Sequence, residues 1–180
     1  MKLHFKEFLV IFVKCSYNVI SRNAMFSIKG EIMEYEFSKG TLAIVPNDME
    51  TSLIYEDNDR YFINQTPFKI MEESCKYFGS SYDGRRESAK SILGAEYKVP
   101  ILVEDSNNLV AFPTTSPQSD DCVWISLKRL KSFEKIDSTN TKIIFDNGIE
   151  IIVPSSFRSI ENQISRASRL DLTLRNRKNS

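Results

Sequence analysis

The chain has 180 residues, of which 41% are hydrophobic and 27% charged, and this composition is typical of a single globular domain. Its 24 basic and 24 acidic residues give a net charge of zero. This balance excludes the globally basic chain that is usual for nucleic-acid-binding proteins, but it is compatible with a local basic face on an acidic body.

Charged residues are distributed unevenly along the sequence. Residues 31–73 hold ten acidic and three basic residues, whereas residues 76–98 hold five basic and three acidic ones. Two more segments with an excess of basic residues follow at 128–142 and 155–180. A basic face would therefore form only if the fold brings these separate segments together.

Residues 1–30 are predicted to be an N-terminal extension. Their apolar run, FLVIFV at 8–13, is short for a signal peptide and far too short to span a bilayer, so no membrane segment is expected. An alternative hypothesis is that the true start of the protein lies at Met25 or Met33.

The first half of the domain is predicted to consist mostly of strands. Polar–apolar alternation and a β-rich apolar run predict two short strands in residues 33–48, around a turn at Lys39 and Gly40. Residues 52–65 predict a hairpin, because two β-rich arms flank the turn-forming cluster EDND at 56–59.

The middle of the chain has weaker signals. Residues 66–78 are compatible with a strand or a short helix, and apolar residues spaced by three and four positions favour a helix that starts after Pro67 and stops at Gly79. Residues 79–98 are expected to form an exposed loop, with one helical turn at 86–93 as an alternative.

More strands are predicted in the second half. Residues 99–113 predict a hairpin, residues 114–121 a polar loop, and residues 122–136 begin as a strand. Residues 141–154 give the clearest hairpin signal, because Asp-Asn-Gly lies between two β-branched arms.

A long C-terminal helix is predicted after Pro154, with Ser155 or Ser156 as its N-cap. Apolar residues from Phe157 to Leu174 recur every three or four positions, which is the spacing of one helix face. The expected fold class is therefore α+β: mainly antiparallel sheet with about seven or eight short strands, a helix or loop inserted in the middle, and this long helix.

No catalytic or metal-binding motif is found in the sequence. The only histidine is His4, in the extension, so no histidine base is available to a serine or cysteine of the domain. The stretch GSSYDG at 79–84 has Asp83 where a nucleophile elbow needs glycine, and no Gly-Lys-Ser/Thr follows for a phosphate-binding loop. We therefore expect no enzyme activity, no cofactor and no metal.

The three cysteines, Cys15, Cys75 and Cys122, are odd in number and far apart in the sequence. This pattern does not predict a disulfide framework. It indicates reduced, mostly buried thiols in a cytosolic protein.

The stretch SCKYFGSSYDGRR at 74–86 combines glycines, hydroxyls, aromatic rings and basic side chains in one short segment. It resembles the S-C-aromatic-FGSSY-x-GR signature of the competence transcription factor (ComK) family of Gram-positive bacteria. Four further blocks resemble this family in the same order: EYEFSKGTLAIVP (34–46), VPILVEDSNNLVAFPTTS (99–116), CVWIS (122–126) and FDNGIEIIVPSSFRSIENQISRAS (145–168). Five ordered blocks within residues 34 to 170 make the resemblance specific.

The resemblance implies a transcriptional activator that binds A/T-rich boxes of duplex DNA, mainly through the minor groove, and switches on the genes for DNA uptake. It also implies action as a homodimer or a dimer of dimers, in the cytoplasm at the nucleoid. Residues 31–174 would then be the DNA-binding domain, followed by a basic tail at 175–180. Family members usually continue well past this point into a tail that a proteolysis adaptor is thought to engage, so we expect that control to be lost or altered.

The segment at 74–86 has the composition of a phosphate-binding turn, although an ordinary surface loop would also explain it. Phosphates attract Arg and Lys, and compact Gly and Ser residues let backbone amides approach a phosphate closely. A narrow A/T-rich minor groove has an enhanced negative potential that attracts arginine. With the C-terminal helix as a second element, the predicted DNA-contacting residues are Lys76, Ser80, Ser81, Tyr82, Arg85, Arg86, Lys90, Arg166 and Arg169.

Several other residues have more than one interpretation that the sequence leaves open. Arg158, with the other arginines of the helix, contacts phosphates, lines a dimer seam or is simply solvated. Asn162 and Gln163 either read adenine edges or brace the fold. Trp124 and Phe112 either lie in the core, which we expect, or form platforms on which bases stack. A third basic patch, or else ordinary surface, is formed by Lys128, Arg129 and Lys131.

Two other functions remain compatible with the sequence. A small antiparallel sheet with a helix is a common scaffold for protein interaction, and the acidic segment at 31–73 fits such a module. A diverged family copy that dimerises without binding DNA would act as an inhibitor.

Overall fold

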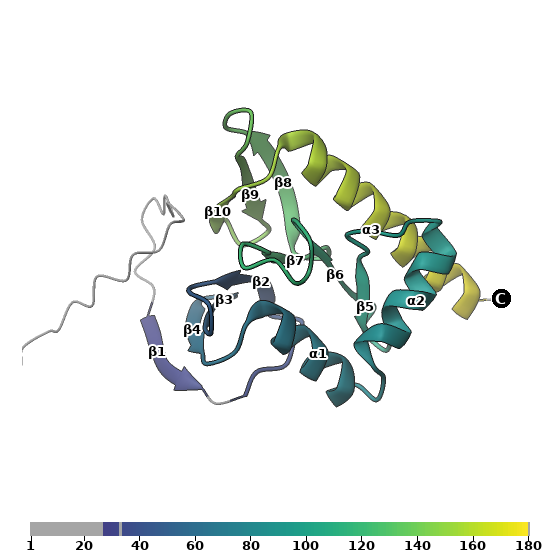
Figure 1. The fold of residues 1–180 in the computed structure, drawn as a ribbon, viewed down its shortest axis with the longest axis horizontal. Helices are drawn as coiled ribbons and strands as arrows, with labels where there is room; N and C mark the ends of the chain where they lie inside the picture. The colour runs from purple at the N-terminus through teal and green to yellow at the C-terminus, as the bar shows by residue number, and fades with distance from the viewer. Residues whose placement is uncertain (1–26, 33, 180) are drawn as a thin grey trace, which may run out of the picture.

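The computed structural model describes residues 27–32 and 34–179, which form two β-sheets and three helices (Figure 1). Most of the predicted extension, with His4, Cys15 and Met25, lies outside the described residues, and so does Met33. The fold is α+β, as the sequence predicts.

The larger sheet has seven strands, and the smaller sheet has three. The larger sheet has the order β1 (Ser27–Ile32), β4 (Asp59–Ile63), β3 (Ser52–Glu56), β2 (Thr41–Pro46), β7 (Trp124–Ser126), β6 (Leu109–Pro113) and β5 (Ile101–Glu104). The smaller sheet has the order β10 (Glu150–Val153), β9 (Thr141–Phe145) and β8 (Leu130–Lys135). Strand β1 pairs with β4 in parallel, and all other neighbours are antiparallel.

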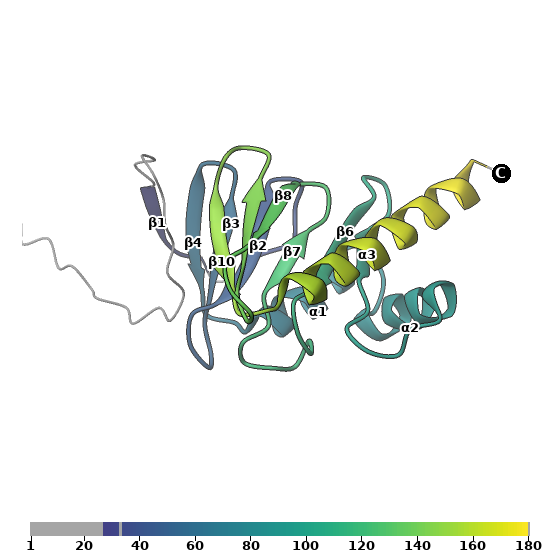
Figure 2. The ribbon, with the colours of Figure 1, turned by 90° about the horizontal axis from the view of Figure 1, so that it is seen from above.

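The helices are α1 (Pro67–Tyr77), α2 (Tyr82–Leu93) and α3 (Phe157–Lys178). Helix α1 begins after Thr66, whose side chain accepts a hydrogen bond from the Lys69 backbone, and Pro67 occupies its first turn. Helix α3 has Ser156 as its N-cap and continues through most of the segment predicted as a basic tail. Figures 1 and 2 show α3 as a long rod that extends away from the smaller sheet toward the C-terminus.

The predicted hairpins at 52–65, 99–113 and 141–154 are confirmed as the antiparallel pairs β3–β4, β5–β6 and β9–β10. The strand predicted in residues 34–37 is wrong. The sequence alternates here because Tyr35 and Phe37 are buried. The segment is not a strand, since the Phe37 N–H donates a hydrogen bond to Ser74 Oγ of α1 at 2.9 Å and not to a neighbouring strand.

The number of strands also exceeds the seven or eight predicted, because ten are present in the described residues. Part of the excess comes from residues 122–136, which hold two strands. A turn at residues 127–129 carries the chain from β7 in the larger sheet to β8 in the smaller one. Strand β1 adds a further pairing that begins within the predicted extension.

Two hydrophobic cores lie on opposite faces of the larger sheet. Successive side chains of a strand point to opposite faces, so Leu53 and Tyr55 of β3 join one core and Ile54 joins the other. The first core is completed by the smaller sheet, by α3 and by one side of α2. The second core is completed by α1 and by Tyr82 at the start of α2. Phe112 and Trp124 are fully buried, as predicted.

Arg129 connects turns from both sheets at one end of the molecule. Its guanidinium donates to the Asp146 carboxylate in the β9–β10 turn at 2.8–3.0 Å and forms an ion pair with Asp57 in the β3–β4 turn at 2.7 Å. It also donates to the carbonyls of Lys39 and Gly40. The hydrogen bonds from Arg129 hold the pKa of Asp146 below its usual value. Arg129 therefore stabilises the folded structure and does not contribute to a basic patch of unpaired charges.

We predict that Arg129→Met lowers the free energy of unfolding by about 2 kcal/mol at neutral pH, because several hydrogen bonds between charged groups are lost. The pKa of Asp146 is lower in the folded than in the unfolded state, so its stabilising effect is complete above about pH 4 and is lost at lower pH. The difference between variant and wild type, measured by urea denaturation, should therefore shrink below pH 4. Lys69→Met, which breaks exposed ion pairs with Glu72 and Glu73, should have little effect at either pH.

Candidate nucleic-acid interface

The serine- and glycine-rich segment of the sequence forms the turn between α1 and α2. Phe78 ends α1, and Gly79 follows with a φ of +77°, a conformation that favours glycine. Ser81 is the N-cap of α2, and its hydroxyl accepts a hydrogen bond from the Gly84 N–H at 3.0 Å. We call residues 78–81 the α1–α2 turn.

The exposed loop predicted for residues 79–98 is therefore wrong over most of its length. Residues 82–93 form a helix of 12 residues, much longer than the alternative of one helical turn. It ends at Gly94, which has a φ of +62° and closes the last turn by a hydrogen bond to the Lys90 carbonyl.

Tyr82 anchors the turn to the second core. It is only 6% exposed, and its ring makes edge-to-face contacts with Phe68 and Trp124, at centroid distances of 5.1 and 6.2 Å. Its hydroxyl is buried without a hydrogen-bond partner among the described residues, and burial raises its pKa. The predicted contact between Tyr82 and DNA does not agree with this position, because the side chain faces the core.

Cys75 and Cys122 lie in the same core as free, buried thiols, as predicted. Burial raises the pKa of Cys75 to about 11 and that of Cys122 to about 12. Both thiols are therefore protonated at neutral pH, which makes them weak nucleophiles.

Three of the predicted basic residues form ion pairs with nearby carboxylates. Lys76 pairs with Glu73 at 3.0 Å, and Arg86 pairs with Glu87 at 3.4 Å. Lys90 pairs with Glu87 at 3.2 Å and with Glu96 at 2.8 Å. Exposed ion pairs of this kind are weak, so a phosphate can replace the carboxylate at little cost.

Arg85 differs from its three basic neighbours. It lies half-buried in the first turns of α2, close enough to Cys75 for its charge to lower the pKa of that thiol, against the larger effect of burial. Its Nε is buried without a hydrogen-bond partner among the described residues, and it forms no ion pair with a carboxylate there. Among Lys76, Arg85, Arg86 and Lys90, Arg85 is therefore the one that forms no ion pair with a described carboxylate.

Arg166 and Arg169 brace the segment that follows α2. Arg166 donates to the Tyr97 carbonyl at 3.1 Å, and Arg169 donates to the Ile92 carbonyl at 3.4 Å. Both line a groove of 360 Å³ between α3 and residues 93–97. Gln163 is buried and donates to the carbonyls of Lys98 and Pro113, so it braces the fold, one of its two predicted roles.

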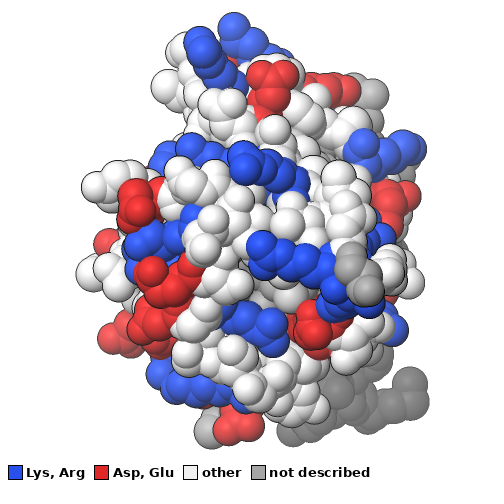
Figure 3. All heavy atoms as spheres, turned by 90° about the vertical axis from the view of Figure 1, so that its right-hand side faces the viewer, with Lys and Arg blue, Asp and Glu red and all other residues white. Residues whose placement is uncertain are grey.

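The predicted residues gather only in part. Figure 3 views the right-hand side of Figure 1, where α2 and the C-terminal half of α3 lie, and there Lys and Arg cover much of the centre with Asp and Glu between them. Acidic partners such as Glu73, Glu87 and Glu96 account for this mixture near α2. In place of the basic face that the sequence allows, this side of the molecule has a mixed surface of basic and acidic residues.

A family model described as ComK protein matches residues 32–179, which include both candidate elements. The chain belongs to the ComK protein family. It is also 34% identical over 137 residues to the competence transcription factor of Bacillus subtilis (strain 168), an alignment that covers 74% of this chain and 71% of that protein. No solved structure matches the chain.

Membership of the ComK protein family confirms the resemblance seen in the five sequence blocks. Within residues 27–32 and 34–179, none of the helices combines the length and the apolar character needed to cross a membrane. The same residues contain no group of three or more His, Cys, Asp or Glu side chains placed to hold a metal ion.

We predict that Ser81→Ala destabilises the protein by about 1 kcal/mol, because the Gly84 N–H at the start of α2 loses its capping acceptor. Ser80→Ala is the matched control, since the Ser80 hydroxyl caps neither helix. Its effect should stay within about 0.5 kcal/mol. Thermal unfolding followed by circular dichroism measures both, and equal effects would contradict the capping role of Ser81.

Proposed function

We propose that the protein is a DNA-binding transcriptional activator of genetic competence. The observation that carries this proposal is membership of the ComK family, together with a relative named competence transcription factor that aligns over 74% of the chain. In this proposal the protein binds A/T-rich boxes as a homodimer or a dimer of dimers, in the cytoplasm at the nucleoid. The family resemblance also suggests a proteolysis adaptor as a partner, in an altered form of the control that longer family members have.

The α1–α2 turn and the start of α2 are the proposed DNA-contacting element. The first backbone N–H groups of a helix lack partners within the helix, and the helix dipole favours an anion there. Ser80 and Ser81 add hydroxyl donors beside these N–H groups. Arg85 and Arg86 follow in the first turns and supply the positive charge that a narrow A/T-rich minor groove attracts.

Lys76 and Lys90 flank this element, and their exposed ion pairs can be exchanged for phosphates. Arg166 and Arg169 complete the proposed interface from α3. Each guanidinium has five N–H donors, and the brace to a backbone carbonyl uses only part of them. Tyr82 supports the turn from within the core and is assigned no contact with DNA.

We predict that Arg85→Ala/Arg86→Ala weakens binding to an A/T-rich duplex and flattens the dependence of log K on log salt by about one unit per lost phosphate contact. The preference for A/T-rich over G/C-rich duplex should also fall, because groove-entering arginines read groove shape. Gel-shift titrations of both duplexes at two salt concentrations measure all three quantities.

The matched control is Lys69→Ala/Lys178→Ala, which removes the same charge from two lysines that are paired with Glu73 and Asp105. Its binding should stay close to that of the wild type. Equal binding by both double variants would remove the α1–α2 turn from the interface. A wild-type chain that binds neither duplex would contradict the proposed function itself and favour a protein-interaction role.

A further inference from the structure

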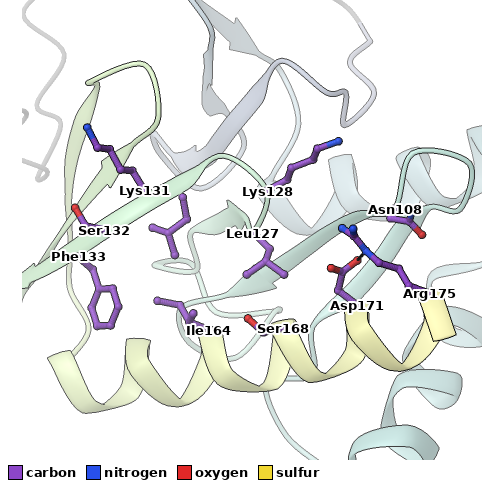
Figure 4. Close-up of a pocket in the computed structure, with 11 residues that line it drawn as sticks. Asn108, Leu127, Lys128, Lys131, Ser132, Phe133, Ile164, Ser168, Asp171 and Arg175 are labelled. Carbon is purple, nitrogen blue, oxygen red and sulfur yellow. Dashed lines mark hydrogen bonds and ion pairs between the residues drawn. The ribbon is translucent and has the colours of Figure 1, made fainter.

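A groove separates the edge of the smaller sheet from α3. It has a volume of 450 Å³, and its floor is formed by Leu127, Leu130, Phe133 and Ile164, which pack against the first core. Figure 4 shows Lys128 and Lys131 on the strand side of this groove, with both side chains pointing away from α3. The lysines therefore extend outward from the rim and do not fill the groove.

Strand β8 is an edge strand, since its neighbours in the order β10–β9–β8 lie on one side only. Leu130 pairs with Phe145 and Ser132 pairs with Ile144, so Lys131 is the extra residue of a β-bulge. Lys128 precedes the strand, Lys135 ends it, and all three lysines are exposed. We call Lys128, Lys131 and Lys135 the β8 lysine row.

The charges of the β8 lysine row are free, unlike those of many other lysines in the protein. None of the three side chains makes a hydrogen bond or ion pair with another described residue. The nearby acids already have other partners: Glu134 pairs with Lys142 at 3.0 Å, and Asp171 pairs with Arg175 at 2.9 Å. The rim of the groove is therefore left with unneutralised positive charge.

A second copy of β8 is a poor partner for this edge. In a two-fold antiparallel pairing centred on Phe133, Lys131 of one copy would lie opposite Lys135 of the other, and like charges directly opposite are destabilising. A bulge and lysines are also devices that protect an edge from pairing. Protection of the edge does not explain Lys128, because this residue lies outside the strand.

We propose that the β8 lysine row binds the phosphate backbone of duplex DNA, and this inference rests on the DNA-binding function proposed above. Duplex DNA carries one negative charge per roughly 1.7 Å of its axis. An extended strand rises about 3.3 Å per residue, so Lys131 and Lys135 lie about 13 Å apart and reach different phosphates.

The β8 lysine row and the α1–α2 turn serve different stretches of duplex. The smaller sheet packs on one face of the larger sheet, and α1 packs on the other. The row therefore contacts DNA that flanks the stretch held by the turn. Phosphate contacts carry no sequence information, so the row strengthens binding to every duplex equally.

The test compares Lys131→Gln/Lys135→Gln with Lys69→Gln/Lys178→Gln in the full chain. Both variants lose two positive charges, but only the control lysines have carboxylate partners. Gel-shift titrations use long A/T-rich and G/C-rich duplexes at 50 and 200 mM salt. The row variant should bind both duplexes at least about tenfold more weakly at 50 mM salt, with a salt slope lower by about one to two units.

The ratio of A/T-rich to G/C-rich affinity should not change in the row variant, in contrast to Arg85→Ala/Arg86→Ala. Adding Lys128→Gln to the row variant should lower the salt slope further. Lys131→Arg/Lys135→Arg should keep wild-type affinity, because the charge is retained. The exposed lysines have no partners to lose, so thermal unfolding should be unchanged.

Equal affinities and slopes for the row variant and its control would overturn the inference. If the wild type binds DNA and Arg85→Ala/Arg86→Ala weakens that binding, this result would leave the proposed function intact. If the wild type binds neither duplex, the proposed function fails, and the inference fails with it.

Discussion

Burial of both faces of the larger sheet is the constraint on which the rest of the structure depends. Strands β2 and β3 contribute apolar side chains to both cores, so each face needs its own cover. The smaller sheet and α3 cover one face, and α1 with the start of α2 covers the other. This division places the α1–α2 turn and the β8 lysine row with elements that cover opposite faces of the larger sheet.

Elements defined by local turn chemistry could be predicted from the sequence. The β9–β10 hairpin follows from Asp146-Asn147-Gly148, because Gly148 adopts a φ of +86° in the turn. Helix α1 follows from Pro67 at its start and Gly79 at its end. Helix α2 could not be predicted, since its buried residues are few and Gly84 lies in its first turn. It is stabilised by its two caps and by packing against both cores, which only the tertiary structure reveals.

For the candidate site, the sequence identified the basic residues but not their partners. The ion pair of Lys90 with Glu87 is an i,i+3 contact that requires α2 to be helical, and the brace from Arg166 to Tyr97 joins residues 69 positions apart. Burial of Tyr82 depends on Phe68 and Trp124, which meet only in the fold. The sequence also does not show that Lys131 lacks an ion-pair partner, because this depends on the ion pair between Glu134 of β8 and Lys142 of β9.

A chain without net charge attracts a polyanion only where its basic residues are not offset by its own acids. In this protein Asp57 and Asp146 are held by Arg129, Glu134 by Lys142, and Asp171 by Arg175. These acids are therefore paired with other cations and leave the β8 lysine row without ion-pair partners. Near α2 the arrangement differs, since Lys76, Arg86 and Lys90 share their charge with exposed carboxylates.

Under the proposed function, the two surfaces suit different tasks. Unopposed lysines attract any phosphate and act over a Debye length, which is about 8 Å at physiological salt. The cations near α2 must exchange a carboxylate partner for a phosphate. The binding energy they gain is only the difference between these two interactions, so their net attraction for DNA is weaker and depends more on geometry. Arg85 lies in the first turns of α2 and forms no ion pair with a described carboxylate. In the proposed interface it is therefore the residue that we expect to recognise the shape of the minor groove.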